Sequence, residues 1–449
     1  MHIHFIAIGG SAMHNLALAL HQKGDTITGS DDEIFEPSKS RLQKANILPE
    51  TFGWFPEKIS SNLDAVILGM HAKEDNPELL KAKELGLKIY SYPEYLYEHS
   101  KNKTRVVIGG SHGKTTITAM ILHVMHYHQK EVDYMVGAQL DGFDTMVHLT
   151  KENDFIVLEG DEYLSSPIDR RPKFHLYKPN IALLSGIAWD HINVFPTFQN
   201  YVEQFQIFID SIVKGGSINY NEEDTEVVKV VEASQNTIRK IGYHTPAYTI
   251  ENGVTLLETP EGLMPIEIFG EHNLNNLAGA KWICQHLGID EDDFYEAISG
   301  FKGASKRLEK IAESATSVAY KDFAHSPSKV EATTKAVKAQ YPNRKLIACL
   351  ELHTYSSLNP QFLKEYRGAL DAADVAMVFY SPHALEIKKL EPIAKEQISN
   401  AFQREDLVIY TDAKAFKEFL FAQDFKNSTL LLMSSGNYGG LDFEELKTL

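Results

Sequence analysis

A glycine-rich segment between an extended apolar stretch and a helical pattern constrains this chain more than any other feature. Residues 109–116 read Gly-Gly-Ser-His-Gly-Lys-Thr-Thr, and the apolar residues 105–108 before them predict a strand. Ile117, Met120 and Ile121 then recur at the spacing of one helix face. A strand, a glycine turn and a helix start form a cradle in which backbone N–H groups and a lysine surround an anion. The segment therefore predicts an α/β fold with a phosphate-binding loop, and ATP is the expected ligand.

Two side chains of this loop have specific expected roles. Lys114 would place its ammonium on a phosphate, and the hydroxyl of Thr115 would bind a phosphate-bound Mg²⁺. The strict pattern G-x-x-x-x-G-K-[ST] requires glycine at position 108, where this chain has Ile108. A glycine turn that only caps a helix is the simpler alternative. The expected ATP-binding residues of the loop are Gly110, Ser111, His112, Gly113, Lys114, Thr115 and Thr116.

Composition narrows the class of protein. The formal net charge of −17 argues against a surface for nucleic acid or for an anionic membrane. Cys284 and Cys349 lie far apart in apolar contexts, which predicts reduced core thiols. The N-terminus lacks the pattern of a signal peptide, and no apolar run is long enough to span a bilayer. We expect a cytoplasmic protein without a membrane or nucleic-acid partner.

The apolar pattern divides the chain into three α/β segments. Extended residues 3–8 begin the first, a phosphate loop opens the second, and four buried strand patterns between 346 and 433 belong to the third. We expect domains at 1–99, 100–303 and 304–449: a Rossmann-like N-terminal domain, a central P-loop ATPase domain and a C-terminal Rossmann-like domain. The polar residues 100–103 are expected to be a linker.

Further polar residues follow predicted strands or begin predicted helices, where α/β sheets bind ligands. Glu159 follows an apolar strand pattern and could hold Mg²⁺, while His191 could bind a second ion or orient phosphate. Asn273 and Asn276 could read a base edge and tether loops. Arg307, in the run from Lys306 to Glu309, could reach a γ-phosphate. Taken singly, each has an ordinary structural explanation, such as an acidic turn or a capped helix.

Together these motifs resemble the Mur ligase family, whose ATP loop reads G-T-x-G-K-T/S. Residues 110–115 match it with Ser111 in place of threonine, which accounts for the glycine missing at position 108. The resemblance extends over the whole chain. It implies ATP-dependent amide formation, in which Lys114, Glu159, His191 and Arg307 are catalytic, and Thr115, Glu159 and His191 hold Mg²⁺. It also implies that Asp322 and His325 join Asn273, Asn276 and Arg307 at the nucleotide. The C-terminal domain, 304–449, is expected to bind the incoming peptide or amino acid.

The N-terminal segment resembles the branch of this family that recognises UDP-N-acetylmuramate with a Rossmann-like domain. The diphosphate is expected on the first helix N-terminus, with Asp31 near the nucleoside. The residues expected at this substrate are Gly9, Gly10, Ser11, Ala12, Met13, Ser30, Asp31, His71 and Asn76.

Two acceptors compete within that branch. Residues 159–163, 169–174 and 433–440 resemble members that add the tripeptide L-Ala-γ-D-Glu-meso-diaminopimelate in peptidoglycan recycling, and this is the leading expectation. The alternative acceptor is L-alanine, as in de novo synthesis, but those members carry a basic H-R-F-T-R-T segment. Residues 353–357 here are His-Thr-Tyr-Ser-Ser, without either arginine.

Gln204 stands where other members have a carbamylated lysine, so no such modification is expected, in agreement with this branch. Several positions depart from the family pattern, namely Gly186, Ala188, Ser326 and His353. A non-catalytic partner protein is therefore a remote alternative. A folylpolyglutamate-type ligase would lack the first domain, and a nicotinamide dehydrogenase would leave Lys114 and Glu159 without a role. We expect a monomer or a weak homo-oligomer.

Overall fold

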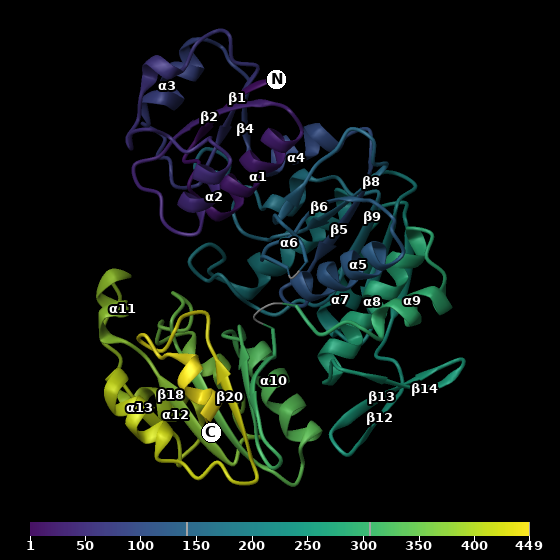
Figure 1. Ribbon diagram of the computed structural model, residues 1–449, viewed down its shortest axis with the longest axis vertical. Coiled ribbons are helices and arrows are strands. Elements are labelled where there is room, and N and C mark those ends of the chain that lie inside the picture. Colours follow the sequence, from purple (N-terminus) through teal and green to yellow (C-terminus); the bar gives the residue numbers. More distant parts are fainter. Residues whose placement is uncertain (141, 305–306, 449) are drawn as a thin grey trace. The chain divides into compact units, whose positions relative to one another are not determined.

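The computed structural model describes residues 1–140, 142–304 and 307–448 and has the expected α/β architecture of mostly parallel sheets (Figure 1). Lys306 lies outside the described residues. The chain forms two compact units. Unit 1 comprises Met1–Ile187, Val202–Tyr243 and Trp282–Ile289, and unit 2 comprises Ala188–Tyr201, His244–Lys281 and Asp290–Leu449. Among the described residues, no helix is long and apolar enough to cross a membrane. Cys284 and Cys349 are buried and free, as expected.

The first sheet, in unit 1, has four parallel strands in the order β2-β1-β3-β4. They are β1 (His2–Ile6), β2 (Thr26–Ser30), β3 (Ala65–Leu68) and β4 (Ile89–Ser91), with helices α1 (Ser11–Gln22), α2 (Ser38–Lys44), α3 (Pro77–Glu84) and α4 (Tyr92–Ser100). The first strand ends earlier than the apolar pattern predicts, because Ala7 has a left-handed backbone (φ 67°). The expected linker is short: Ser100 still belongs to α4, and the next strand begins at Thr104.

The second sheet, also in unit 1, has seven strands in the order β11-β10-β9-β5-β8-β6-β7. They are β5 (Thr104–Gly109), β6 (Asp133–Met135), β7 (Val147–His148), β8 (Phe155–Glu159), β9 (Ile181–Leu184), β10 (Ser217–Asn221) and β11 (Arg239–Tyr243); only β7 is antiparallel to its neighbour. Helices α5 (Lys114–Tyr127), α6 (Phe198–Asp210) and α7 (Thr225–Ala233) follow its strands. Because β5 is central, the loop after it lies between the ends of β8 and β9.

A three-stranded antiparallel sheet was not anticipated from the sequence. It consists of β12 (Tyr248–Glu251), β13 (Val254–Thr259) and β14 (Gly262–Ile266), and α8 (Glu271–His286) and α9 (Glu291–Ile298) follow it. Asn252 and Gly253 both have positive φ in the β12–β13 turn. An Asn-Gly pair between short strands is a strong hairpin signal, so this element was predictable.

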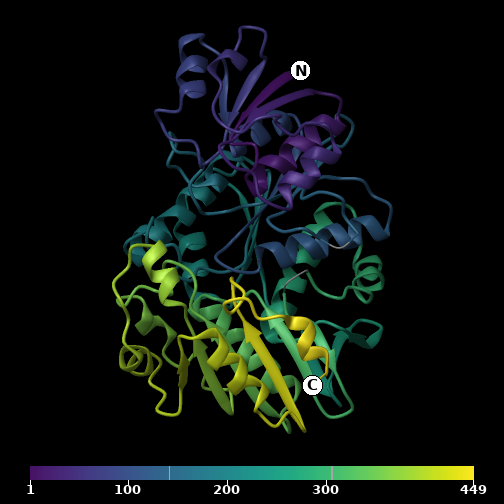
Figure 2. The ribbon, with the colours of Figure 1, turned by 60° about the vertical axis from the view of Figure 1, so that its left-hand side comes forward.

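The fourth sheet, in unit 2, has six strands in the order β15-β16-β20-β17-β18-β19. They are β15 (Glu309–Glu313), β16 (Val318–Asp322), β17 (Lys345–Glu351), β18 (Val375–Phe379), β19 (Val408–Tyr410) and β20 (Ser428–Met433), with helices α10 (Pro327–Gln340), α11 (Pro382–Ile387), α12 (Lys395–Phe402) and α13 (Ala413–Phe421). The last strand, yellow in Figure 2, returns between β16 and β17. The four strands expected here are present, whereas β15 and β16 were not foreseen.

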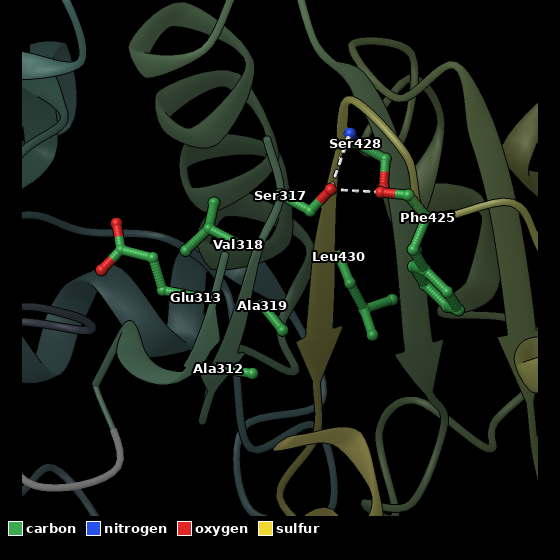
Figure 3. A pocket seen from close by; sticks show the side chains of 8 residues that line it. All are labelled: Ala312, Glu313, Ser317, Val318, Ala319, Phe425, Ser428 and Leu430. Carbon is green, nitrogen blue, oxygen red and sulfur yellow. Dashed lines mark hydrogen bonds between the residues drawn. The ribbon is translucent and has the colours of Figure 1, made fainter. Parts of the chain in front are cut away.

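A shallow pocket lies at the amino-terminal ends of β16 and β20 (Figure 3). Ser317 donates a hydrogen bond to the carbonyl of Phe425 and accepts one from the N–H of Ser428 at 3.5 Å. Val318, Ala319 and Leu430 are among the residues that line it. Parallel sheets bind ligands at the opposite, carboxyl ends of their strands, so this pocket is a structural junction between loops.

Candidate ATP and substrate sites

The phosphate loop depends on two glycines with positive φ. Gly110 (φ 134°) follows β5, and Gly113 (φ 80°) precedes α5. A Cβ on Gly110 would collide with the Oγ of Ser185, which itself hydrogen-bonds the loop at the carbonyl of His112. Ile108 is a fully buried residue of β5, so the turn begins two residues after it. The glycine of the strict pattern is not needed at position 108 for that reason.

The start of α5 is suited to an anion. Gly113 is its N-cap and supplies no side chain to hydrogen-bond the first N–H groups of the helix. Such N–H groups and the partial positive charge of the helix end favour a phosphate. The N–H of Ser111 donates a hydrogen bond to the carbonyl of Gly186 at 2.9 Å, and Thr116 is buried.

Lys114 is paired with a buried carboxylate. Its Nζ donates to the Oε2 of Glu162 at 2.7 Å and to the carbonyl of Gly110. Burial lowers the pKa of Lys114, but the carboxylates of Glu162 and Asp161 outweigh burial and raise it. The ammonium is therefore charged, and a phosphate oxygen could take the place of Glu162. The sequence analysis had given Glu162 no role.

Thr115 and Glu159 lie together, as a magnesium site requires. The hydroxyl of Thr115 donates to Oε1 of Glu159 at 2.9 Å, and the N–H of Gly137 donates to Oε2 at 2.7 Å. A hydroxyl and a carboxylate are ligands that fit Mg²⁺, which retains water and phosphate oxygens as its other ligands. The described residues contain no group of three or more His, Cys, Asp or Glu side chains arranged to hold a metal. The pair thus fits an ion bound partly by ATP.

In unit 2, His191 and His325 lie around a buried carboxylate, Asp190. The N–H of His191 donates to Oδ1 of Asp190 at 2.7 Å, and His191 has a left-handed backbone (φ 54°). Burial raises the pKa of Asp190, but the charges of His191, Lys329 and His325 outweigh burial and lower it. Burial and the charge of Lys329 lower the pKa of His325 to about 4. Since Thr115 and Glu159 belong to unit 1, a joint metal site with His191 stays a prediction.

Arg307, Asp322 and His325 are close to one another in unit 2. The guanidinium of Arg307 lies 4.7 Å from the ring centre of Phe323, whose ring meets that of His325 edge-on at 5.2 Å. The two oxygens of Asp322 accept from the N–H groups of Leu308 and Ala324. The structure thus groups three residues that the sequence analysis placed at the nucleotide.

The two asparagines expected near adenine lie in α8. Asn273 donates from Nδ2 to the carbonyl of Phe269 at 3.0 Å, and Asn276 is buried. Recognition of the base by these two asparagines stays a prediction.

The residues expected at the uridine nucleotide follow three neighbouring strands of the first sheet. After β1, the N–H of Gly9 donates to Oδ2 of Asp31 at 2.7 Å, and Gly10 starts α1 without a side-chain cap. Ser30 is the last residue of β2 and Asp31 follows it, and His71 is exposed after β3. Burial, together with neighbouring Asp32, raises the pKa of Asp31 to about 6.

The other residues expected at this substrate have different environments. Ser11 is exposed at the start of α1, Ala12 is partly exposed beside it, and Met13 is buried in the core. Asn76 is buried and caps α3, where its Oδ1 accepts from the N–H groups of Glu78 and Leu79. A structural role explains Asn76 and Met13 in this geometry, and substrate contact by either stays a prediction.

A glycine loop, a charged lysine and a hydroxyl–carboxylate pair that fits Mg²⁺ are the features of an ATP-dependent enzyme. Two family models match the chain: "Mur ligase family, catalytic domain" over residues 2–104 and "Mur ligase middle domain" over residues 108–284. The UDP-N-acetylmuramate–L-alanine ligase of Sulfurihydrogenibium sp. is 30% identical over 383 residues, covering 84% of this chain and 82% of that protein. The protein of the same name from Persephonella marina is 27% identical over 97% of this chain and 94% of its own length.

The chain therefore belongs to the Mur ligase family and is an ATP-dependent acid–amino-acid ligase. Solved structures share its fold. The UDP-N-acetylmuramate-alanine ligase of Thermotoga maritima has a TM-score of 0.69 at 20% identity, and the murein peptide ligase of Psychrobacter arcticus has 0.65 at 22%. Each alignment covers 100% of this chain and 98% of the other.

Proposed function

We propose that this enzyme joins L-alanine, either free or as the first residue of a peptide, to the lactyl carboxylate of UDP-N-acetylmuramate. The observation that carries the proposal is the arrangement of Lys114, Thr115 and Glu159 at the end of β5 and β8, in a chain that belongs to the Mur ligases. The carboxyl ends of β1, β2 and β3 provide a second helix N-terminus for the diphosphate of the sugar nucleotide.

The chemistry needs ATP because a carboxylate is a poor electrophile at neutral pH. An oxygen of the lactyl carboxylate attacks the γ-phosphorus, the bond to the β-phosphate oxygen breaks, and ADP leaves. The acceptor amine then attacks the acyl carbon, inorganic phosphate leaves and the amine loses a proton. Lys114 would stabilise the charge on the transferred phosphoryl group. Thr115 and Glu159 would hold Mg²⁺, which would neutralise phosphate charge, and a contribution of His191 to this ion stays a prediction.

The curated relatives favour free L-alanine as the acceptor. The Sulfurihydrogenibium and Persephonella proteins are both L-alanine ligases by name, and they align with most of this chain. This ranks L-alanine ahead of the tripeptide, which was the leading expectation from the sequence.

One observation keeps the tripeptide as a second candidate. The basic segment of alanine-adding members is replaced by residues 353–357, in which Thr354 donates to Oγ of Ser357 at 3.0 Å and accepts from its N–H at 3.1 Å. This closed turn offers no guanidinium to the carboxylate of free alanine. In the tripeptide the alanine carboxyl group is already an amide, so a guanidinium at that position has no alanine carboxylate to bind.

Phosphate release by the purified chain with ATP, Mg²⁺ and UDP-N-acetylmuramate distinguishes these acceptors. We expect turnover when L-alanine is added, and turnover with the tripeptide alone would establish the second candidate. UDP-N-acetylglucosamine, which lacks the lactyl carboxylate, is the control and should give none. Failure with both acceptors would refute the proposed function.

A further inference from the structure

The carboxyl ends of β17 and β20 in unit 2 have the topology of a ligand site. The two strands are parallel neighbours. After β17 the chain packs on one face of the sheet, where Leu352 and Leu363 join the core with Val330 of α10. After β20 it packs on the other face, where Tyr438 joins Phe416 of α13. In open parallel sheets, ligands bind at the carboxyl ends of strands whose connections leave to opposite faces.

A buried carboxylate stands at this point. Glu351 is the last residue of β17, and its side chain is only 3% exposed. Its Oε2 accepts hydrogen bonds from the hydroxyl of Ser434 and from the N–H of Tyr438 at 2.8 Å. A Cβ on Gly436 would lie 2.7 Å from Oε2, so the loop after β20 fits closely around the carboxylate.

The other oxygen of Glu351 lacks a donor. The nearest cationic group is Nδ1 of His353, 3.8 Å from Oε1, which is too long for a hydrogen bond. No other group in the described part of the chain donates to Oε1. In the adjoining loop, the buried Oγ of Ser435 also has no hydrogen-bond partner. Because the Glu351 side chain is only slightly exposed, a cation that reaches this oxygen would form a strong, charge-assisted hydrogen bond.

We propose that Oε1 of Glu351 binds a primary ammonium group of the acceptor. This rests on the proposed function, because the acceptor of an amide-forming ligase is an amine. The ammonium has two sources: the α-ammonium of L-alanine, present in both candidate acceptors, and the second ammonium of a diamino acid in a peptide. Either would give Glu351 a charge-assisted hydrogen bond.

The test is the KM for the acceptor in the Glu351→Gln variant of the full chain. Glutamine can still accept from Ser434 and Tyr438 with its oxygen, but its neutral NH₂ group replaces Oε1. We expect the acceptor KM to rise about 10- to 100-fold, the usual effect of losing a hydrogen bond to a charged group. The KM values for ATP and UDP-N-acetylmuramate should stay unchanged. Glu365→Gln, an exposed carboxylate of the same unit, is the matched control.

Three acceptors separate the sources of the ammonium: L-alanine, L-Ala-γ-D-Glu and L-Ala-γ-D-Glu-meso-diaminopimelate. A higher KM for every acceptor that is used assigns Glu351 to the α-ammonium. A higher KM for the diaminopimelate peptide alone assigns it to the second ammonium. An unchanged KM for every acceptor in a folded variant would overturn the proposal.

A second variant guards against misfolding. Glu351→Asp keeps the charge, so its acceptor KM should lie between those of the wild type and the Glu351→Gln variant. An acceptor KM as high as that of the Glu351→Gln variant would show a purely structural role and overturn the proposal. Thermal unfolding of all variants reports whether they fold. If the wild type uses no acceptor, the proposed function fails first, and the assignment of Glu351 fails with it.

Discussion

At the scale of single residues, carboxylates hold the side chains of the candidate ATP site in place, and a bound nucleotide would displace or share them. Glu162 accepts a hydrogen bond from the ammonium of Lys114, and Glu159 accepts one from the hydroxyl of Thr115. Because the ammonium of Lys114 is already charged and positioned, binding of a phosphate requires an exchange of partners rather than a change of protonation.

Replacing Lys114 with alanine should lower kcat/KM for phosphate release by about 10²–10³-fold, the usual cost of removing one transition-state charge partner. Unfolding of the variant should remain cooperative. Lys151→Ala, at an exposed loop residue, is the matched control and should behave as the wild type. Turnover of Lys114→Ala at the wild-type rate would show that this loop is not the ATP site.

Sequence patterns predicted the residues of this site whose role follows from their position after a strand. Lys114, Thr115 and Glu159 are examples, because glycine spacing and strand ends are visible in the chain. Glu162, Asp190 and Glu351 were not assigned, since their importance arises from burial and from partners distant in sequence. An acidic residue at or shortly after the end of a buried strand was the available signal for Glu162 and Glu351, whereas Asp190 lies farther from the end of β9.

At the scale of elements, the junction of α4, β5 and β6 depends on one buried aspartate. Asp133 accepts from Nζ of Lys103 at 2.6 Å, from the N–H of Thr150 at 2.9 Å and from Nε2 of His99 at 3.3 Å. Burial raises the pKa of Asp133, but these hydrogen bonds outweigh burial and lower it. The carboxylate therefore stabilises the fold while it is ionised.

Replacing Asp133 with asparagine should lower the free energy of unfolding by about 3–5 kcal/mol at pH 7, because it leaves Lys103 without its buried partner. A depressed pKa stabilises fully above the unfolded value of about 3.9, and that contribution is lost as the pH falls through the folded value. The gap in thermal midpoint between wild type and variant should accordingly narrow below about pH 4. Asp154→Asn, an exposed substitution nearby, is the control. A gap that stays constant from pH 7 to pH 3.5 would contradict this account.

Elements with a clear period were the predictable part of the fold. Helix α5 and strands β17, β18 and β20 match the apolar patterns of the sequence. The sequence analysis did not predict strands β15 and β16, because β15 is largely exposed and its pairing with β16 contains an irregularity between Lys310 and Ala312. Alternation is weak in such strands, and tertiary pairing determines them.

At the scale of the whole molecule, membership of the Mur ligase family joins the separate sites into one reaction. Unit 1 contains the phosphate loop and the first sheet, while unit 2 contains His191, Arg307 and Glu351. A reactive acyl phosphate must be shielded from water, so a ligase with parts in separate units is expected to close over its substrates during turnover.

The transfer of ¹⁸O from substrate to phosphate tests the central claim most directly. UDP-N-acetylmuramate labelled with ¹⁸O in its lactyl carboxylate is incubated with ATP, Mg²⁺ and the acceptor, and the released phosphate is analysed by mass spectrometry. Activation as an acyl phosphate predicts one ¹⁸O atom in each phosphate released. Phosphate released without the label, at the same rate as amide formation, would contradict the account.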